Sequence, residues 1–256
     1  MTINKLFFSK QQMKSSTKLF NYFIFFGMLV CVLIASIINI RNNPGDTTLQ
    51  IVVAIGAMFG VTSTILAAQG NILNFVIGAL GAVIETYVLW KNGVTSMFLL
   101  YLLYFLPMDV VGFINWRKRG ASVHKEVKAQ RMTGRKWLYV VLGYIAVSAA
   151  AFCISYFAGH NNMGSGIPAK MVTDALATSA TIVAIVMMTM AYMEQWYIWT
   201  LVNLSNIALW SVNLATTPDS AYTVVMLIKY VFYLINGLNA IRIWLKLSKK
   251  DEGLQV

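Results

Sequence analysis

The sequence predicts an all-α polytopic membrane protein with eight transmembrane helices. Of its 256 residues, 58% are hydrophobic and only 11% are charged, whereas soluble domains carry about 25% charged residues. The apolar residues gather in runs of about 20, which is the length that an α-helix needs to cross a bilayer. Short polar or basic segments separate these runs, so we expect the chain to cross the membrane repeatedly.

The eight predicted spans follow one another with short connections. The first, over residues 19–40, is too long for the core of a signal peptide and lacks a cleavage site, so we interpret it as a transmembrane helix. The segments "AAQGN" and "YMEQW" are so short that they predict tight helical hairpins. Pro44, Pro168 and Pro218 mark loops on the opposite side. The other spans cover approximately residues 49–68, 71–90, 94–115, 137–158, 171–193, 195–213 and 221–245.

The basic residues predict the orientation of the chain. Lys and Arg concentrate in the N-terminal segment, in the loop near residues 117–136 and in the tail, whereas the opposite loops hold Arg41, Lys91 and Lys170. The positive-inside rule places the three basic segments in the cytoplasm, which an even number of spans allows. The net charge of +11 belongs to these segments. Because no soluble basic domain carries it, we do not expect nucleic-acid binding.

The sequence holds little that would support a metal, a cofactor or catalysis. Cys31 and Cys153 lie inside apolar spans, and His124 and His160 lie in loops without a spaced partner. No Ser/His/Asp, HExxH or paired-carboxylate motif is present in the sequence. We therefore expect no metal site, no cofactor and no enzyme.

Spans two to four and six to eight have the same rhythm of helices, turns and loops. A shift of 125 residues places Thr64 on Thr189 and Gly112 on Gly237. Because a single span separates the triplets, both enter the membrane in the same direction, which predicts a parallel 3+1+3 repeat plus an N-terminal extra helix. The predicted division is a cytoplasmic basic N-terminus (1–18), an extra helix (19–40), a first repeat (49–115), a basic loop with a linker helix (116–158), a second repeat (171–245) and a cytoplasmic tail (246–256).

A polar and aromatic stripe runs along span seven. In "EQWYIWTLVNLSNIALW" the side chains of Trp196, Trp199, Asn203, Asn206 and Trp210 share one helix face. Equivalent helices of a parallel repeat line a central cavity from both sides. We therefore expect the stripe to face a shared pocket, opposite its counterparts at Asn71, Asn74, Gly78, Gly81 and Glu85.

These segments also resemble a known family. The motif "WYIW", the following Asn203 and "KYVFYLINGLNAIRIW" in the last span are similar to the PnuC vitamin transporters, bacterial relatives of the SWEET sugar transporters. The resemblance covers nearly the whole chain from about residue 20. It implies facilitated diffusion of nicotinamide riboside, a vitamin B3 nucleoside used for NAD biosynthesis, across the inner membrane, with trapping by a cytoplasmic kinase. Relatives that carry thiamine or riboflavin share the architecture, so these vitamins remain alternatives. A homo-oligomer, with a trimer as the first guess, is also expected.

The stripe provides the first predicted substrate-binding residues. The indoles of Trp196 and Trp199 can stack on the pyridinium cation of nicotinamide riboside, although an interfacial aromatic belt would use the same residues. Amides can bond the ribose hydroxyls or the carboxamide, or they can serve as contacts between helices. The predicted amides are Asn203, Asn206, Asn74, Asn71 and, in the first tight turn, Gln69.

The last span provides a second predicted set, and an intramembrane lysine is its most unusual member. Lys229 would either reach the membrane surface, pair with a carboxylate, or donate to hydroxyl groups at the edge of the pocket. The carboxylates near membrane depth are Glu85, Asp109, Asp174 and Glu194. The other predicted binding residues are Tyr233, Asn236, Asn239 and Tyr104, the last being the position that the shift of 125 pairs with Lys229.

We interpret Pro107, Asp109 and Glu194 as gating or hinge residues for alternating access by rocking of the two triplets. Pro107 should kink the fourth span, because it lacks a backbone N–H. A distant alternative from another class is a retinal-binding photoreceptor, with Lys229 as the Schiff base and Asp109 as its counter-ion. That alternative predicts a coloured protein and leaves the repeat unexplained.

Overall fold

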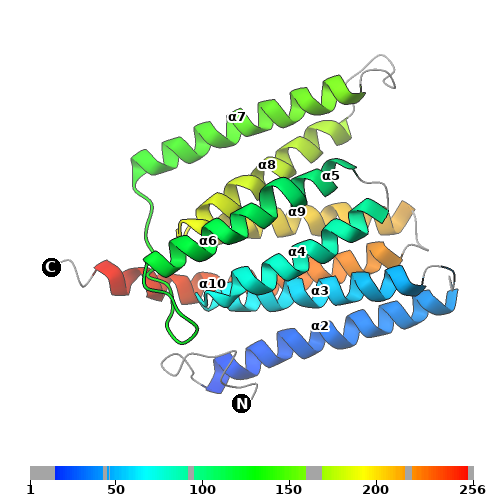
Figure 1. Cartoon of the computed structure of the whole chain (residues 1–256), viewed down its shortest axis with the longest axis horizontal. Coiled ribbons are helices and arrows are strands. Elements are labelled where there is room, and N and C mark those ends of the chain that lie inside the picture. Colours follow the sequence, from blue (N-terminus) through cyan, green and yellow to red (C-terminus); the bar gives the residue numbers. More distant parts are fainter. Residues whose placement is uncertain are drawn as a thin grey trace.

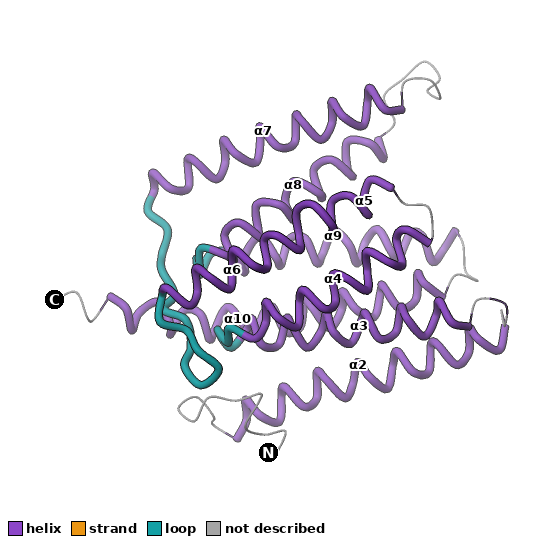
Figure 2. Tube along the Cα trace, in the orientation of Figure 1, coloured by secondary structure: helices purple, strands orange, loops and turns teal. Residues whose placement is uncertain are grey.

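The computed structural model describes residues 15–42, 45, 47–91, 95–159, 169–216 and 221–252. Over these residues the chain is nearly all helical, and its long helices lie side by side (Figures 1 and 2). The helices are α2 (Ser15–Asn42), α3 (Thr47–Ala68), α4 (Leu73–Lys91), α5 (Thr95–Leu100), α6 (Leu106–Lys118), α7 (Gly134–Gly159), α8 (Ala169–Thr189), α9 (Gln195–Thr216) and α10 (Ala221–Glu252); a π-helical segment, η2 (Tyr101–Phe105), joins α5 to α6.

Each of the eight predicted spans corresponds to a helix, with α5, η2 and α6 together forming the fourth. Within the described residues, 6 of these helices are long and apolar enough to cross a membrane, namely α2, α3, α4, α5–α6, α7 and α10. The apolar run of α8 is shorter, and α9 carries the polar stripe. Residues 1–14 of the predicted basic N-terminal segment lie outside the described residues. Pro44, Pro168 and Pro218, which mark the predicted loops, lie outside them as well.

The fourth span contains an irregular turn just before Pro107. Pro107 is the second residue of α6 and has no N–H to donate to the preceding turn. The N–H of Leu106 donates to the carbonyl of Tyr101, five residues earlier, which makes η2 a π-helical turn. The sequence predicted a kink at this proline, whereas the structure accommodates it with an extra residue in the turn before it.

The helices form two groups of three, and equivalent helices of the two groups make equivalent contacts. The first group contains α3, α4 and α5–α6, and the second contains α8, α9 and α10. The first helix of each group packs against the last helix of the other, as α3 does with α10 and α8 with α6. α2 packs against α3 and α10, and α7 packs against α8, so these two helices lie at opposite outer edges (Figure 1). This order agrees with the predicted 3+1+3 plan.

The two tight turns are built alike. Gly70 and Ala191 both have positive φ, at 68° and 59°, and their N–H groups donate to Ala67 O and Met188 O respectively. The turns therefore correspond at a shift of 121 residues, and the predicted shift of 125 is wrong there. Because four residues are about one helical turn, the predicted helix faces are kept, but the paired residues are displaced by one turn.

The loop over residues 119–133 joins these turns at one end of the bundle. The N–H of Val127 donates to Gly70 O, and that of Gln130 donates to Ala191 O, both at 3.0 Å. The start of α2 and the end of α10 lie at the same end (Figure 1), as the charge pattern predicts. We call it the basic end because it holds Arg117, Lys118, Arg119, Lys125, Lys128, Arg131, Lys246 and Lys249.

Candidate functional site

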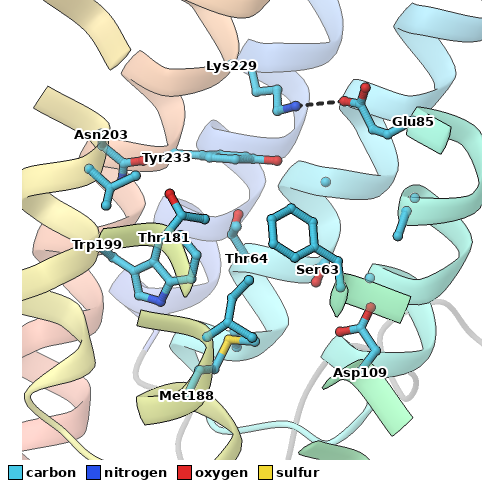
Figure 3. A pocket seen from close by; sticks show the side chains of 18 of the residues that line it. Ser63, Thr64, Glu85, Asp109, Thr181, Met188, Trp199, Asn203, Lys229 and Tyr233 are labelled. Carbon is cyan, nitrogen blue, oxygen red and sulfur yellow. Dashed lines mark hydrogen bonds and ion pairs between the residues drawn. The ribbon is translucent and has the colours of Figure 1, made fainter. Parts of the chain in front are cut away.

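A cavity of about 230 Å³ lies between the two groups of helices (Figure 3). Its walls come from α3, α4, η2 and α6 on one side and from α8, α9 and α10 on the other. Four glycines on α3 and α4 also line it and leave its centre open. Its polar and aromatic lining consists of Ser63, Thr64, Glu85, Tyr101, Phe105, Asp109, Thr181, Trp196, Trp199, Asn203, Lys229, Tyr230 and Tyr233.

A buried ion pair bridges the two groups in this cavity, away from the basic end. Lys229 Nζ on α10 lies 2.8 Å from Glu85 Oε1 on α4, and the two side chains are 7% and 14% exposed. The Nζ also lies 5.8 Å and 5.9 Å from the ring centroids of Tyr230 and Tyr233, within the range of cation–π contacts. The predicted pairing of Lys229 with a carboxylate is confirmed, and the alternative in which it reaches the membrane surface is wrong.

α9 forms an aromatic and amide wall from the start of the predicted stripe. Trp196, Trp199 and Asn203 line the cavity, whereas Asn206 does not and donates to Val202 O at 2.8 Å. The Nε1 of Trp196 is buried without a hydrogen-bond partner among the described residues. A buried donor of this kind is costly to leave unpaired.

Asp109 on α6 lines the cavity on the side opposite Trp199 (Figure 3). It lies against Gly78 of α4, where a Cβ would stand 3.3 Å from its Oδ1 and 3.1 Å from Ser63 Oγ. Ser63 donates its hydroxyl to Asn74 O at 2.9 Å, so this proton is directed to the backbone. Two acidic side chains thus line the cavity. Glu85 has a cationic partner, and Asp109 has none within the described structure.

Two indoles tie the helices together beneath the cavity, toward the basic end. Trp116 of α6 donates Nε1–H to Met188 O at 2.8 Å, and Trp244 of α10 donates to Ala67 O at 3.0 Å. The two rings are in contact, with centroids 5.5 Å apart. Each group's last helix therefore holds the final turn of the other group's first helix, which closes this end of the cavity.

Beyond the indoles, the predicted gating residue Glu194 lies in the second tight turn and is 4% exposed. Its Oε1 lies 3.2 Å from Nε of Arg131 in the loop of the basic end. The other carboxylate that the sequence raised, Asp174, has a side chain outside the described residues. Glu194 does not line the cavity and instead ties the loop to the turn between α8 and α9.

Several predicted binding residues bond to the protein and lie outside the lining. Asn74 donates to Asn71 O at 2.6 Å, and Asn236 donates to Thr64 O at 2.9 Å. Tyr104 donates its hydroxyl to Ile182 O at 2.8 Å, which joins η2 to α8. The hydrogen bonds of Asn74, Asn236 and Tyr104 favour a role in contacts within the protein over direct contact with a ligand. Their role in substrate binding stays a prediction. Gln69, Asn239 and Pro107 also lie outside the lining.

Some cavity residues escaped prediction from the sequence. Tyr101 and Phe105 reach the cavity because η2 changes which side chains share a face, and α-helical spacing does not foresee this. Thr181 lies in α8, where no polar stripe draws attention to it. Tyr230 also lines the cavity and was not among the predicted binding residues. Glu85 was predicted as a carboxylate near membrane depth but not as a binding residue, although its spacing from Asn74, Gly78 and Gly81 was a usable signal.

Comparisons with known proteins identify the family. A profile described as "Nicotinamide mononucleotide transporter" matches residues 50–246. The chain belongs to this family. A relative from Neisseria mucosa, named "Nicotinamide riboside transporter PnuC", is 30% identical over 204 residues, which are 78% of this chain and 74% of the relative. A relative of the same name from Haemophilus influenzae is 24% identical over 198 residues, or 77% and 80% of the two chains.

A solved structure supports the same assignment. The one described as "Crystal structure of the Vitamin B3 transporter PnuC" superposes with a TM-score of 0.67 at 28% identity, covering 90% of this chain and 93% of the other. The chain is therefore a multi-pass membrane transporter and not an enzyme, and the resemblance to the PnuC family is confirmed. The family assignment and the ion pair of Lys229 overturn the retinal-binding alternative.

Proposed function

We propose that this family member carries nicotinamide riboside across the bacterial inner membrane. The observation that carries the proposal is the charge of the cavity. Its described lining holds two acidic side chains and one basic side chain, and the basic one, Lys229, is already paired with Glu85. Indole faces and a remaining carboxylate suit a ligand that bears a positive aromatic ring. Nicotinamide riboside has such a ring, together with hydroxyls and an amide that can bond Asn203.

The same charges favour the nucleoside over its phosphorylated form. The family's description names the mononucleotide, whereas the two relatives are named for the riboside. A phosphate monoester brings roughly −1.5 to −2 charge and is usually held by arginines. No arginine belongs to the described cavity lining. A phosphate there would meet Asp109 and Glu85 with no unpaired cation to compensate it.

Two other vitamins remain alternatives for the substrate. Thiamine also carries a positive ring, so the charge of the cavity does not separate it from nicotinamide riboside. Riboflavin has a neutral three-ring system, so it gains less from the unpaired carboxylate in the described cavity lining than a positive ring does. The hydroxyls of a ribose would be matched by the amide of Asn203 and by the phenol of Tyr233, both of which line the cavity.

For the mechanism, we propose uniport by alternating access, in which the two three-helix groups rock about the cavity. The Lys229–Glu85 pair would hold the groups together at one end, and the Arg131–Glu194 pair with the indole contacts would hold them at the basic end. Both termini and the basic end would face the cytoplasm. A cytoplasmic kinase would trap the substrate by phosphorylation, and the transporter would assemble as a homo-oligomer such as a trimer.

The test is calorimetric titration of the purified protein in detergent with nicotinamide riboside, its mononucleotide, thiamine and riboflavin. We expect binding of the riboside and at least about tenfold weaker binding of the mononucleotide, since one close like-charge pair can cost that much. Replacing the cavity indole in Trp199→Ala should weaken riboside binding by about tenfold, because a desolvated cation–π contact contributes up to about 2 kcal/mol.

The matched control is Trp210→Ala, which removes an indole from the same helix outside the cavity lining. It should leave riboside affinity within about twofold. Tight binding of thiamine or riboflavin alone would change the proposed substrate but would leave the assignment as a vitamin transporter unchanged. Equal losses in the Trp199 and Trp210 variants would show that the aromatic wall supports the fold and not the ligand.

A further inference from the structure

We infer that Asp109 is the counter-ion for the substrate's positive ring and that it selects cationic over neutral nucleosides. The inference rests on the proposed function and singles out one side chain, which the sequence marked as a gating residue and as one of four carboxylates near membrane depth. Three features of the described cavity support this role, namely the open position of the carboxylate, the pairing of the other charged side chains, and the aromatic wall across from it.

The position of Asp109 keeps its carboxylate open to the cavity. Gly78 on the neighbouring helix has no side chain to cover it, and a Cβ there would stand 3.3 Å and 3.5 Å from the two carboxylate oxygens. Ser63, the nearest polar neighbour of that position, sends its hydroxyl proton to Asn74 O. The carboxylate therefore keeps its oxygens for a partner that enters the cavity.

The other two charged side chains of the described lining pair with each other, which leaves the Asp109 carboxylate without a cationic partner. Within the described residues, Lys229 is the basic side chain of the lining, and it lies 2.8 Å from Glu85 Oε1. A lone carboxylate at membrane depth is expensive unless something pairs with it, and such groups commonly mark ion or substrate sites. The pyridinium of the proposed substrate supplies the missing positive charge. Binding then removes an electrostatic cost that the empty cavity carries.

The aromatic wall completes the arrangement from the other group of helices. Trp199 lies across the cavity from Asp109 (Figure 3). A positive ring held between them would meet an indole face on one side and a carboxylate on the other, and both attract a cation. The two residues come from different helix groups, α9 and α6, so a bound cation would draw the groups together around it.

The experiment compares two ligands in wild type and in Asp109→Asn. Nicotinamide riboside carries the ring charge, whereas its 1,4-dihydro form keeps the ribose and the amide but has a neutral ring. Affinities come from calorimetric titration of the detergent-purified full chain. We expect Asp109→Asn to weaken binding of the cationic ligand by at least about tenfold. Binding of the dihydro form should change by less than about twofold, so the preference for the cation collapses.

Glu126→Gln is the matched control. It also replaces a carboxylate by the corresponding amide, but on the loop at the basic end and outside the cavity lining. It should keep the preference for the cation, and so should Asp109→Glu. Where Asp109→Asn does not fold, Asp109→Ser permits the same comparison. Equal weakening of both ligands in the Asp109 variants would reveal a structural role and overturn the inference. So would unchanged binding of the cation. Failure of the wild type to bind nicotinamide riboside would instead overturn the proposed function.

Discussion

Gly60 on α3 determines where the ring of Tyr233 on α10 can lie. Both residues line the cavity, and a Cβ on Gly60 would overlap the hydroxyl of Tyr233. Gly60→Ala should therefore push the phenol out of place, because packed interiors do not absorb an added methyl group freely. Overpacking costs about 1–3 kcal/mol, so we expect affinity for nicotinamide riboside to fall by about tenfold in a titration.

The control for this substitution is Gly143→Ala on α7, where a Cβ would meet nothing within 4 Å. It should leave binding unchanged and raise helix stability slightly, since alanine is the better helix former. If Gly60→Ala binds as tightly as wild type while its melting temperature stays the same, then the position of Tyr233 does not matter for the ligand.

At the residue scale, helical phase predicted part of the cavity and missed the rest for identifiable reasons. Trp196, Trp199 and Asn203 share a face of a regular helix, so their spacing in the sequence was sufficient. Tyr101 could not be placed, because a π-helical turn breaks the period of 3.6 residues. Several of the predicted amides lie outside the cavity lining, because an asparagine inside a membrane can bond a backbone carbonyl as well as a ligand.

Between elements, the Lys229–Glu85 pair joins α10 to α4 and should be strongly coupled. Removing one partner leaves a buried charge without compensation, which costs about 3–5 kcal/mol. We expect Glu85→Gln and Lys229→Met each to lower the melting temperature markedly. The double variant should melt higher than at least one of the single variants, because it leaves no lone charge. Thermal unfolding of the four proteins in detergent forms the double-mutant cycle.

Lys91→Met is the comparison for this cycle, because Lys91 is an exposed cation at the end of the same helix, α4. Loss of an exposed charge should change stability by less than about 1 kcal/mol. Simple additivity of the Glu85 and Lys229 effects would contradict a direct interaction between the two side chains.

The elements were largely readable from the sequence, because hydrophobic run length and the distribution of charge act over whole helices. The eight spans and the common end of the basic segments follow from these two properties alone. The register between the groups did not follow. Gly70 and Ala191 correspond at 121 residues and not at 125, and few identities exist to distinguish shifts that differ by one helical turn. The backbone hydrogen bonds of the turns resolve this where side-chain similarity does not.

For the whole molecule, contacts between the groups lie at both ends of the cavity. Away from the basic end they include the Lys229–Glu85 pair. At the basic end, Trp116 and Trp244 bond the opposite groups, and the loop bonds both tight turns. A rocking motion would have to break one set of contacts while keeping the other. A ligand that binds both groups can offset that cost, in agreement with a cavity lined from both sides.

Uniport of a cation has a consequence for the energetics of transport. Each cycle would move one positive charge across the membrane, because no second ion compensates it. A membrane potential contributes about 2.3 kcal/mol per charge per 100 mV, which corresponds to about fiftyfold accumulation. In liposomes that contain the purified protein, an inside-negative potassium diffusion potential of this size should concentrate labelled nicotinamide riboside. The neutral dihydro form should only equilibrate, and proton or sodium gradients without a potential should drive neither ligand. Accumulation of the neutral form on a proton gradient would show ion coupling and contradict uniport.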